Sequence, residues 1–378
     1  MKVGLIRRGY RADGGGEIMT AIYAETLQNH VLPNFLKSFS LDLVVSSRGC
    51  SRSTFAALKK SSGYNVRMVD HPTGYGRLAT ERNFGQAVQT LRAEYDLIQT
   101  HDSIPGCDIV RLGDGLHHVF LQRIKQEHSY LRRIMHNYSR FHRFKLDRQK
   151  ETLLSPSVKL VIAPSAMVMR EALAAFPQLD NKVHVVCNPV RHAKLLNDIR
   201  LRERSDVFYA PKKGLERIRF GFVGSGWARK NLRLCIEAIA KVCDAELHVF
   251  GEDKDLAKYQ RLAERLLCGD RIFFHGVLHI IQAVKFYDVL LQPAFYEPFG
   301  NTVVESYIAG KLVVVSKYCG ASEFLGEGCI ELQDFETETL VTVMQNLLED
   351  IPATVDVDHQ FSQQFFRGRL LEVFRNVL

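Results

Sequence analysis

The sequence predicts an α/β protein built from two doubly wound domains in tandem, and three observations lead to this prediction. Short apolar runs of the strand type alternate with helical patterns along the chain, which is typical of parallel sheets joined by crossover helices. The length of 378 residues exceeds the size at which a single hydrophobic core stops growing. The alternation is interrupted once, by a charged, irregular stretch from Asn188-Pro189-Val190 through Lys212-Lys213-Gly214, which is typical of an interdomain linker.

The first alternating series supplies the strands of one sheet. Helical patterns at 17–39, 81–94 and 118–154 separate several of these strands. The predicted strands are Val3–Ile6, Leu41–Ser46, Asn65–Asp70, Asp96–Thr100, Asp108–Leu112, Leu160–Ala163 and Val183–Cys187.

The second series begins after the irregular stretch. Its predicted strands are Arg219–Val223, Leu247–Gly251, Ile272–His275, Val289–Gln292 and Leu312–Ser316, with helices from Asn231 and up to Leu267. The last residues, Gln360–Leu378, form an amphipathic helical pattern.

These patterns predict the domain organisation. We expect a first domain over 1–190, a linker over 191–217, a second domain over 218–358 and a C-terminal helix over 359–378. Two doubly wound halves in tandem place a cleft between them, with the ligand-binding edges of their sheets facing each other. A helix after the second domain can cross back and pack on the first.

Composition narrows the class of protein. Apolar residues make up 46% and charged residues 24%, as in globular proteins, and no apolar run approaches the roughly 20 residues needed to span a bilayer. The apolar part of the first eight residues is too short for a secretory signal, so we expect a cytoplasmic protein. The eight cysteines include no C-x-x-C pair, which argues against a zinc site or a disulfide framework.

Two carboxylates eight positions apart, Glu297 and Glu305, are the most informative feature of the chain. We expect Glu297 in the loop at the carboxyl edge of a sheet and Glu305 in the first turn of the following helix, with Asn301 or Thr302 as its cap. Ligands of open α/β sheets bind at that edge, and a helix N-terminus attracts phosphate. One acid can face a polyhydroxylated group and the other a ribose, which suggests chemistry on a nucleotide sugar.

Two glycine-rich turns also follow predicted strands. Gly14-Gly15-Gly16 lets the backbone approach a phosphate or sugar closely, although a plain flexible turn explains it as well. After Gly224-Ser225-Gly226, the adjacent cations Arg229 and Lys230 open the next predicted helix. Cations at a helix N-terminus oppose its dipole, so we favour an anion held between them over a solvated helix start.

Asp114, between Gly113 and Gly115, follows another strand of the first half. An exposed carboxylate there can orient or deprotonate an acceptor hydroxyl. The alternatives left open are a turn aspartate and an N-cap of the next helix. His101-Asp102 is a second, weaker candidate of the same kind.

The net charge of +8 and pI of about 9.0 suit a nucleic acid, an anionic membrane or a phosphorylated substrate. The charge is concentrated between Gln122 and Lys150, in a predicted helix that also carries aromatic residues. A solvated face is the common explanation of such a run; contact with an anionic lipid surface or acceptor is the alternative. The candidate contact residues are Arg123, Lys125, Arg132, Arg133, Arg140 and Arg143.

Taken together, these residues resemble the retaining glycosyltransferases of family 4, which have the GT-B fold of two Rossmann-like domains. The E-x7-E motif, here Glu297 to Glu305 with Gly300 in the turn, carries the resemblance, together with Arg229-Lys230. Within the family the chain looks closest to the lipopolysaccharide core glucosyltransferase I group. The supporting segments are Pro105–Asp108, Gly113-Asp114, the basic helix through Tyr138–His142, and Pro293–Glu297.

The resemblance implies the roles of the site residues. Glu297 contacts the transferred sugar and Asp114 is the second catalytic residue. The donor site comprises Gly15, Gly16, Arg229, Lys230, Phe299, Gly300, Asn301, Thr302 and Glu305, in which the Arg-Lys pair holds the diphosphate and Glu305 the ribose.

The implied reaction is transfer of a hexose, glucose or N-acetylhexosamine, from a UDP-sugar to a hydroxyl of an anionic bacterial glycolipid such as the lipopolysaccharide core, with retention at the anomeric carbon. No Asp-x-Asp metal site is visible, so neither a metal nor a further cofactor is expected. We expect the protein in the cytoplasm, where it can also contact the cytoplasmic face of the inner membrane. Alternatives are a GDP-sugar donor, another surface polysaccharide as acceptor, and a non-catalytic basic binding protein. Nucleic acid is not an expected partner.

Overall fold

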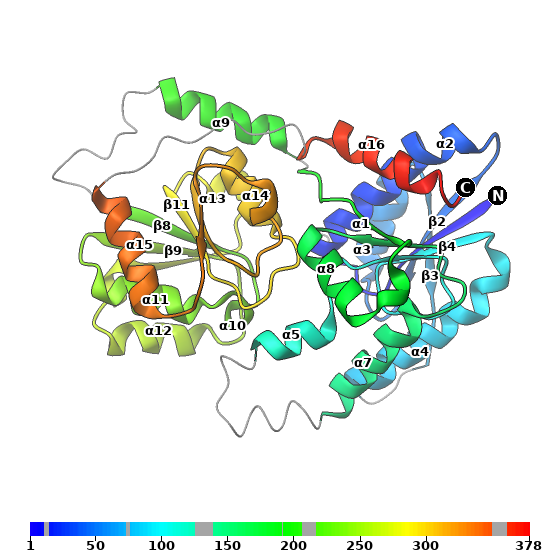
Figure 1. Cartoon of the computed structure of the whole chain (residues 1–378), viewed down its shortest axis with the longest axis horizontal. Coiled ribbons are helices and arrows are strands. Elements are labelled where there is room, and N and C mark those ends of the chain that lie inside the picture. Colours follow the sequence, from blue (N-terminus) through cyan, green and yellow to red (C-terminus); the bar gives the residue numbers. More distant parts are fainter. Residues whose placement is uncertain (11–14, 73–75, 125–138, 191, 206–216, 350–360) are drawn as a thin grey trace. The chain divides into compact units, whose positions relative to one another are not determined.

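The computed structural model describes residues 1–10, 15–72, 76–124, 139–190, 192–205, 217–349 and 361–378 (Figure 1). The chain forms two compact units. Met1–Pro189 and Gln363–Leu378 make the first, and Val190–Ser362 the second. Each unit is built around one parallel sheet with helices on both faces, so the predicted fold class is confirmed.

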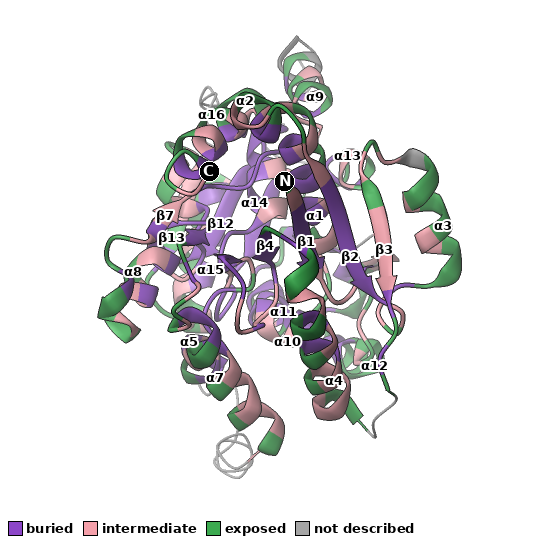
Figure 2. Cartoon of the chain, turned by 90° about the vertical axis from the view of Figure 1, so that its right-hand side faces the viewer, coloured by how far each residue is buried: buried purple, intermediate pink, exposed green. Residues whose placement is uncertain are grey.

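The first sheet has seven strands in the order β3-β2-β1-β4-β5-β6-β7, all parallel to their neighbours. Each lies on one of the seven apolar runs predicted from the sequence. They are β1 (Lys2–Arg7), β2 (Ser40–Ser46), β3 (Asn65–Val69), β4 (Leu97–Thr100), β5 (Ile109–Arg111), β6 (Leu160–Ala163) and β7 (Val183–Val185). Figure 2 shows β1 and β2 buried, in purple, between their helical layers.

The helices of the first unit cover both faces of this sheet. Side chains of β1 alternate between two cores: Val3 and Leu5 pack with one set of helices, and Ile6 packs with Phe84 and Val88 on the other side. Ser51 and Ser165 cap two of the helices by accepting hydrogen bonds from Thr54 N and Val168 N. The helices are α1 (Gly15–Thr26), continued by a π-helical turn (Leu27–Val31), α2 (Leu32–Phe35), α3 (Arg52–Ser61), α4 (Gly76–Leu91), α5 (His117–Ile124), α7 (Arg140–Leu153) and α8 (Ala166–Ala175).

The C-terminal helix α16 (Gln363–Phe374) belongs to the first unit. Phe366 and Phe374 are buried in the same core as β1. The ring of Phe366 meets the edge of Tyr23, with ring centroids 5.0 Å apart. The predicted return of a C-terminal helix to the first domain is therefore confirmed.

The second sheet has six strands, in the same relative order as the first six of the other sheet: β10-β9-β8-β11-β12-β13, again all parallel. Five strands match predicted runs, and one, β13, was not predicted. The strands are β8 (Ile218–Val223), β9 (Ala245–Phe250), β10 (Ile272–Gly276), β11 (Val289–Gln292), β12 (Leu312–Ser316) and β13 (Cys329–Leu332).

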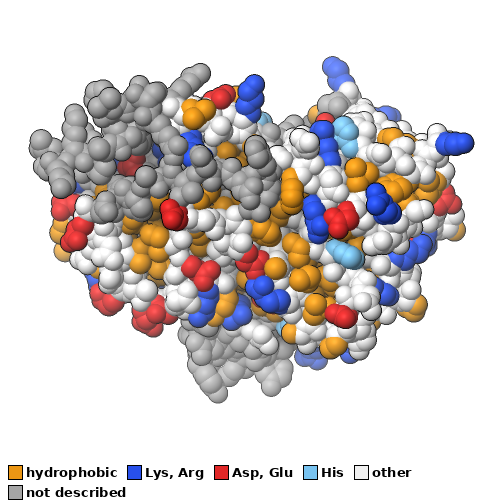
Figure 3. Space-filling model, turned by 45° about the horizontal axis from the view of Figure 1, so that its top comes forward, with side chains coloured by type: hydrophobic (Ala, Val, Ile, Leu, Met, Phe, Trp, Pro, Cys, Tyr) orange, Lys and Arg blue, Asp and Glu red, His pale blue; other side chains and the backbone are white. Residues whose placement is uncertain are grey.

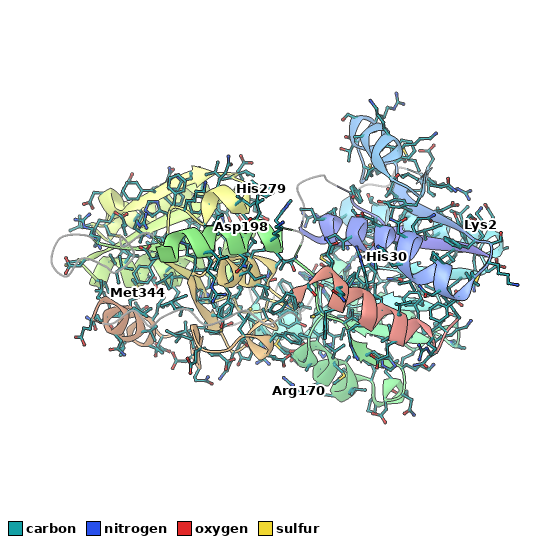
Figure 4. The ribbon with its side chains drawn as sticks, turned by 90° about the horizontal axis from the view of Figure 1, so that it is seen from above. Lys2, His30, Arg170, Asp198, His279 and Met344 are labelled. Carbon is teal, nitrogen blue, oxygen red and sulfur yellow. The ribbon has the colours of Figure 1, made fainter. Side chains whose placement is uncertain are left out.

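One face of this sheet packs on three amphipathic helices. Their apolar sides form a single core with Phe220, Leu247 and Leu291. Met344 of α15, labelled in Figure 4, is fully buried in it. These helices are α11 (Leu232–Lys241), α12 (Leu256–Arg265) and α15 (Thr337–Glu349); the others of the unit are α9 (Ala193–Ser205), α10 (Trp227–Lys230), α13 (Ile280–Ala283) and α14 (Asn301–Ile308).

The range predicted as a linker, 191–217, is not irregular throughout, because it contains α9. Arg200 of α9 is buried against Gly310, at the end of α14. The charged residues that made this stretch look like a linker thus include one face of a packed helix.

None of the helices in the described ranges is long and apolar enough to cross a membrane. All eight cysteines are free thiols, and six of them are buried.

Candidate functional site

The strand order places a candidate ligand edge in each unit. Connections to the two sides of an open parallel sheet diverge at one point, and ligands bind outside the carboxyl ends of the strands there. In the second sheet this point lies between β8 and β11, and in the first between β1 and β4. The segments that follow β8 and β11 are 224–231 and 293–300. They carry four of the nine predicted donor-site residues, and three more lie in the helix α14 that follows β11.

The segment after β8 is held rigidly. Trp227 begins the short helix α10; its backbone N donates to Asp253 Oδ2 (3.0 Å) and its indole Nε1 to Gly224 O (2.9 Å). The Trp227 side chain is buried in the core. Arg229 and Lys230 therefore project from a fixed backbone.

The predicted position of this pair at the start of a helix is corrected. Arg229 and Lys230 form the last turn of α10, and α11 begins only after Asn231, whose φ of 61° separates the two helices. Cations at a helix C-terminus are stabilised by the helix dipole. The helix dipole therefore gives no reason to expect an anion beside Arg229 and Lys230.

Both cations contact a carboxylate of the protein itself. Arg229 Nη1 lies 2.8 Å and Lys230 Nζ 3.0 Å from Glu297 Oε2. Arg229 Nη1 also donates to Tyr296 O (2.8 Å), and Gln292 Nε2 donates to Glu297 Oε2 (3.2 Å). The structure thus brings Arg229, Lys230 and Glu297 into one cluster at the β8/β11 edge.

The charges in this cluster stabilise one another. Burial alone would raise the pKa of Glu297, but the charges of Arg229 and Lys230 lower it to about 2. Burial lowers the pKa of Lys230, and the Glu297 carboxylate opposes that effect. The Glu297 side chain is 14% exposed, so the cluster is shielded yet reachable.

Helix α14 starts directly after the cluster. Gly300 is its N-cap residue with φ of 105°, a conformation that favours glycine, and no side chain caps the helix. The prediction that Asn301 or Thr302 caps it is therefore wrong, because both are already helical. Thr302 instead donates through Oγ1 to Gln292 Oε1 (3.3 Å).

Phe299, a predicted donor-site residue, is 3% exposed. Its ring lies in an aromatic cluster with Phe324 and Phe361. Its ring therefore does not face a ligand, and its backbone carbonyl accepts a hydrogen bond from Ala321 N (2.7 Å).

Glu305 is the fifth residue of α14 and therefore lies in its second turn, not in the first turn as predicted. It is partly buried, and among the described residues no hydrogen bond to its carboxylate is found. Burial raises the pKa of Glu305 to about 7, against a smaller opposite effect of the Lys230 charge. An incompletely solvated carboxyl of this kind can accept hydrogen bonds from hydroxyl groups of a ligand.

The first unit has its own charged cluster at the β1/β4 edge. Arg7, the last residue of β1, donates from Nη1 to His101 O (3.2 Å). The same guanidinium lies 3.7 Å from Asp114 Oδ2 and 3.9 Å from Glu17 Oε1. Burial lowers the pKa of Arg7, but Asp102, Asp114 and Glu17 outweigh burial and raise it.

Asp114 lies in a turn closed by a hydrogen bond from Gly115 N to Leu112 O (3.0 Å), and its side chain is 81% exposed. The N-cap alternative is excluded, because α5 starts at His117, whose N donates to Gln149 Oε1 (2.7 Å). The turn aspartate and the catalytic interpretation are compatible with this geometry.

The other first-unit candidates lie around Arg7. Gly15 and Gly16 begin α1, and Gly14 lies outside the described residues. A Cβ on Gly16 would lie 2.6 Å from Arg7 Nη2, so this glycine gives room to the guanidinium. His101 is buried, and both of its ring nitrogens are hydrogen-bonded: Nε2 accepts from Gln99 Nε2 (3.0 Å), and Nδ1 bonds with Thr20 Oγ1 (3.1 Å).

The predicted basic helix is described only at its two ends. Arg123 lies in α5, while Arg140 and Arg143 are exposed on α7; Lys125, Arg132 and Arg133 lie outside the described residues. On the face drawn in Figure 3, Lys and Arg side chains are interspersed with Asp and Glu. Among the described residues, no group of three or more His, Cys, Asp or Glu could hold a metal ion.

Sequence reasoning missed three polar residues of these edges: Gln292, Arg7 and Asp253. Each lies at or just after the carboxyl end of a strand, at β11, β1 and β9. That position was the available signal, because polar residues that end buried strands point to the ligand edge.

Comparison with known proteins adds the family context. Residues 205–358 match the sequence model described as Glycosyl transferases group 1. The chain is 25% identical over 278 residues to the lipopolysaccharide glucosyltransferase WaaG of Escherichia coli K12, an alignment that covers 68% of this chain and 69% of that protein.

Solved structures share the fold of the whole chain. The crystal structure of WaaG, a glycosyltransferase involved in lipopolysaccharide biosynthesis, matches with a TM-score of 0.69 and 16% identity, covering 100% of this chain and 95% of that one. Anabaena HepE, in complex with UDP and glucose, matches with a TM-score of 0.62 and 19% identity, over 100% and 95%. The chain therefore has the GT-B fold, is related to WaaG, and carries a glycosyltransferase group 1 domain at residues 205–358.

Proposed function

We propose that the protein is a retaining glycosyltransferase that moves a hexose, glucose or N-acetylhexosamine, from a UDP-sugar to a hydroxyl of an anionic bacterial glycolipid such as the lipopolysaccharide core. The observation that carries the proposal is the cluster of Arg229, Lys230 and Glu297 at the switch point of the second sheet. It combines two cations suited to a diphosphate with a carboxylate suited to sugar hydroxyls. The relation to WaaG and the UDP-bound HepE structure support the donor and acceptor classes.

In the proposed reaction, the bond between the anomeric carbon and the diphosphate oxygen breaks. The acceptor oxygen bonds to the same face of that carbon, and its proton passes to the departing diphosphate. Arg229 and Lys230 stabilise the charge that builds on the leaving group. Glu297 contacts the transferred sugar, and Glu305 accepts from the ribose.

On the first unit, Asp114 has the role of orienting the acceptor hydroxyl. Its 81% exposed side chain is open to a ligand, and Arg7 limits its orientation. The exposed Arg140 and Arg143 suit an anionic acceptor or the inner membrane surface, on the cytoplasmic side. No metal or further cofactor enters this scheme, which remains a prediction.

The test is a turnover assay with a panel of UDP-, GDP- and ADP-sugars and a lipopolysaccharide core acceptor. Release of UDP that depends on the acceptor, with the product linkage retained at the anomeric carbon by NMR, is the expected result. If only GDP-sugars were consumed, the donor base would be guanine and not uracil. An absence of turnover and of nucleotide binding throughout the panel would contradict the proposal and favour a non-catalytic role.

A further inference from the structure

Gln292 is a buried polar residue to which neither the sequence patterns nor the proposed reaction gives a role. It ends strand β11 with 0% exposure, and a buried amide is unfavourable unless both of its polar atoms are hydrogen-bonded. Both are. Nε2 donates to Glu297 Oε2 (3.2 Å), and Oε1 accepts from Thr302 Oγ1 (3.3 Å).

The chemistry of the partners fixes the orientation of this amide. An ionised carboxylate only accepts hydrogen bonds, so the NH₂ group of Gln292 must face Glu297. Its oxygen then faces Thr302, whose hydroxyl is the donor. The chain Thr302–Gln292–Glu297 therefore links the first turn of α14 to the carboxylate at the switch point.

The hydrogen bonds on Glu297 are distributed unevenly between its two oxygens. Arg229, Lys230 and Gln292 all donate to Oε2. Among the described residues, no hydrogen bond to Oε1 is found. Three donors on one oxygen hold the carboxylate plane, and the other oxygen retains its full capacity to accept from a hydroxyl group.

We infer that Gln292 and Thr302 are positioning residues, which hold Glu297 by Oε2 so that Oε1 faces a hydroxyl group of the transferred sugar. This inference rests on the proposed function. It adds that the amide acts on the sugar and not on the nucleotide, because Arg229 and Lys230, which serve the diphosphate, keep their ion pairs without it. Loss of the amide should therefore affect a nucleotide sugar and spare the nucleoside diphosphate.

The test compares wild type with Gln292→Leu and Thr302→Val. Tyr307→Phe serves as a control, because it deletes another hydrogen bond of a buried side chain of the second unit, from Tyr307 Oη to Glu327 O (2.6 Å), which involves none of the residues bonded to Glu297. The probes are UDP and UDP-glucose, with the Tm shift for each ligand and the kcat and KM for UDP-glucose as readouts. We expect kcat/KM to fall roughly 10- to 100-fold in Gln292→Leu, as for loss of a hydrogen bond to a charged group. The Tm shift with UDP should stay as in wild type.

Gln292→Glu adds a second readout, the pH profile of activity, which substitution of a merely structural residue would not change. This isosteric carboxyl can donate to Glu297 only while protonated, and once ionised it repels Glu297. Its activity should therefore decline with rising pH over a range in which wild type remains active.

The outcomes distinguish failure of the proposed function from failure of the positioning role of Gln292. A wild-type protein that responds to neither UDP nor UDP-glucose contradicts the proposed function itself. A wild type that responds to both ligands, with Gln292→Leu matching Tyr307→Phe in kcat and KM, overturns the positioning role. An unchanged pH profile of Gln292→Glu overturns it as well.

Discussion

Replacement of Glu305 by glutamine is expected to stabilise the protein at alkaline pH and to leave it almost unchanged in acid. Burial raises the pKa of Glu305 from an ordinary 4.5 to about 7. An acid with a raised pKa holds its proton in the folded state where the unfolded chain releases it, so stability declines as pH rises from about 4.5 through 7.

The size of the effect follows from that difference. Each pKa unit corresponds to about 1.36 kcal/mol, so ionising Glu305 costs up to about 3 kcal/mol of unfolding free energy at pH 8 and less than about 1 kcal/mol at pH 5. Glu305→Gln keeps the shape of the side chain and removes the charge. Its unfolding free energy should exceed that of wild type by most of this amount at pH 8.

Urea denaturation at pH 5 and pH 8 measures the difference. Glu264→Gln, at an exposed position on α12 of the same unit, is the control and should change neither value much. An equal effect of Glu305→Gln at both pH values, or a loss of stability at pH 8, would contradict a raised pKa of Glu305. The gain should be accompanied by weaker UDP binding, because the variant loses the proposed ribose acceptor.

Three further predictions concern the charged edges. Arg229→Ala and Lys230→Ala should each reduce transfer by orders of magnitude while circular dichroism shows a retained fold; unchanged turnover in both contradicts the diphosphate assignment. Asp114→Asn should lower kcat with little change in the KM for the donor, whereas a change confined to the donor KM would argue for another role. The pKa of Glu297, lowered to about 2, predicts stability that is present above about pH 4.5 and lost as pH falls towards 2; acid unfolding curves of wild type and Glu297→Gln that coincide would contradict this.

The strands were predictable because parallel strands that are buried on both faces have continuous apolar sequences. All five residues of β12 and all four of β11 are buried, and both strands were predicted with their observed bounds. In β13 only Leu332 is fully buried, so its composition carried no such signal. Helix α9 was missed for a related reason, since its exposed charged face resembles a linker.

The residue types of the site were predictable, but their pairing was not. Glu297 follows Arg229 and Lys230 by 68 and 67 positions, and only the neighbouring positions of β8 and β11 bring them together. The cap of α14 was assigned to Asn301 or Thr302 from their side chains, yet the backbone of Gly300 makes the turn. The position of Gln292 at the end of β11 pointed to the ligand edge, but its hydrogen bonds to Glu297 and Thr302 could not be predicted from the sequence.

UDP binding is the most direct test of the role proposed for the cluster of Arg229, Lys230 and Glu297. At 100 times Kd, a ligand adds about 2.7 kcal/mol to stability, which moves Tm by several degrees for domains of this size. We expect such a Tm shift with UDP for wild type and its loss in Lys230→Ala. An equal shift in both proteins, or no shift in wild type, would contradict that role.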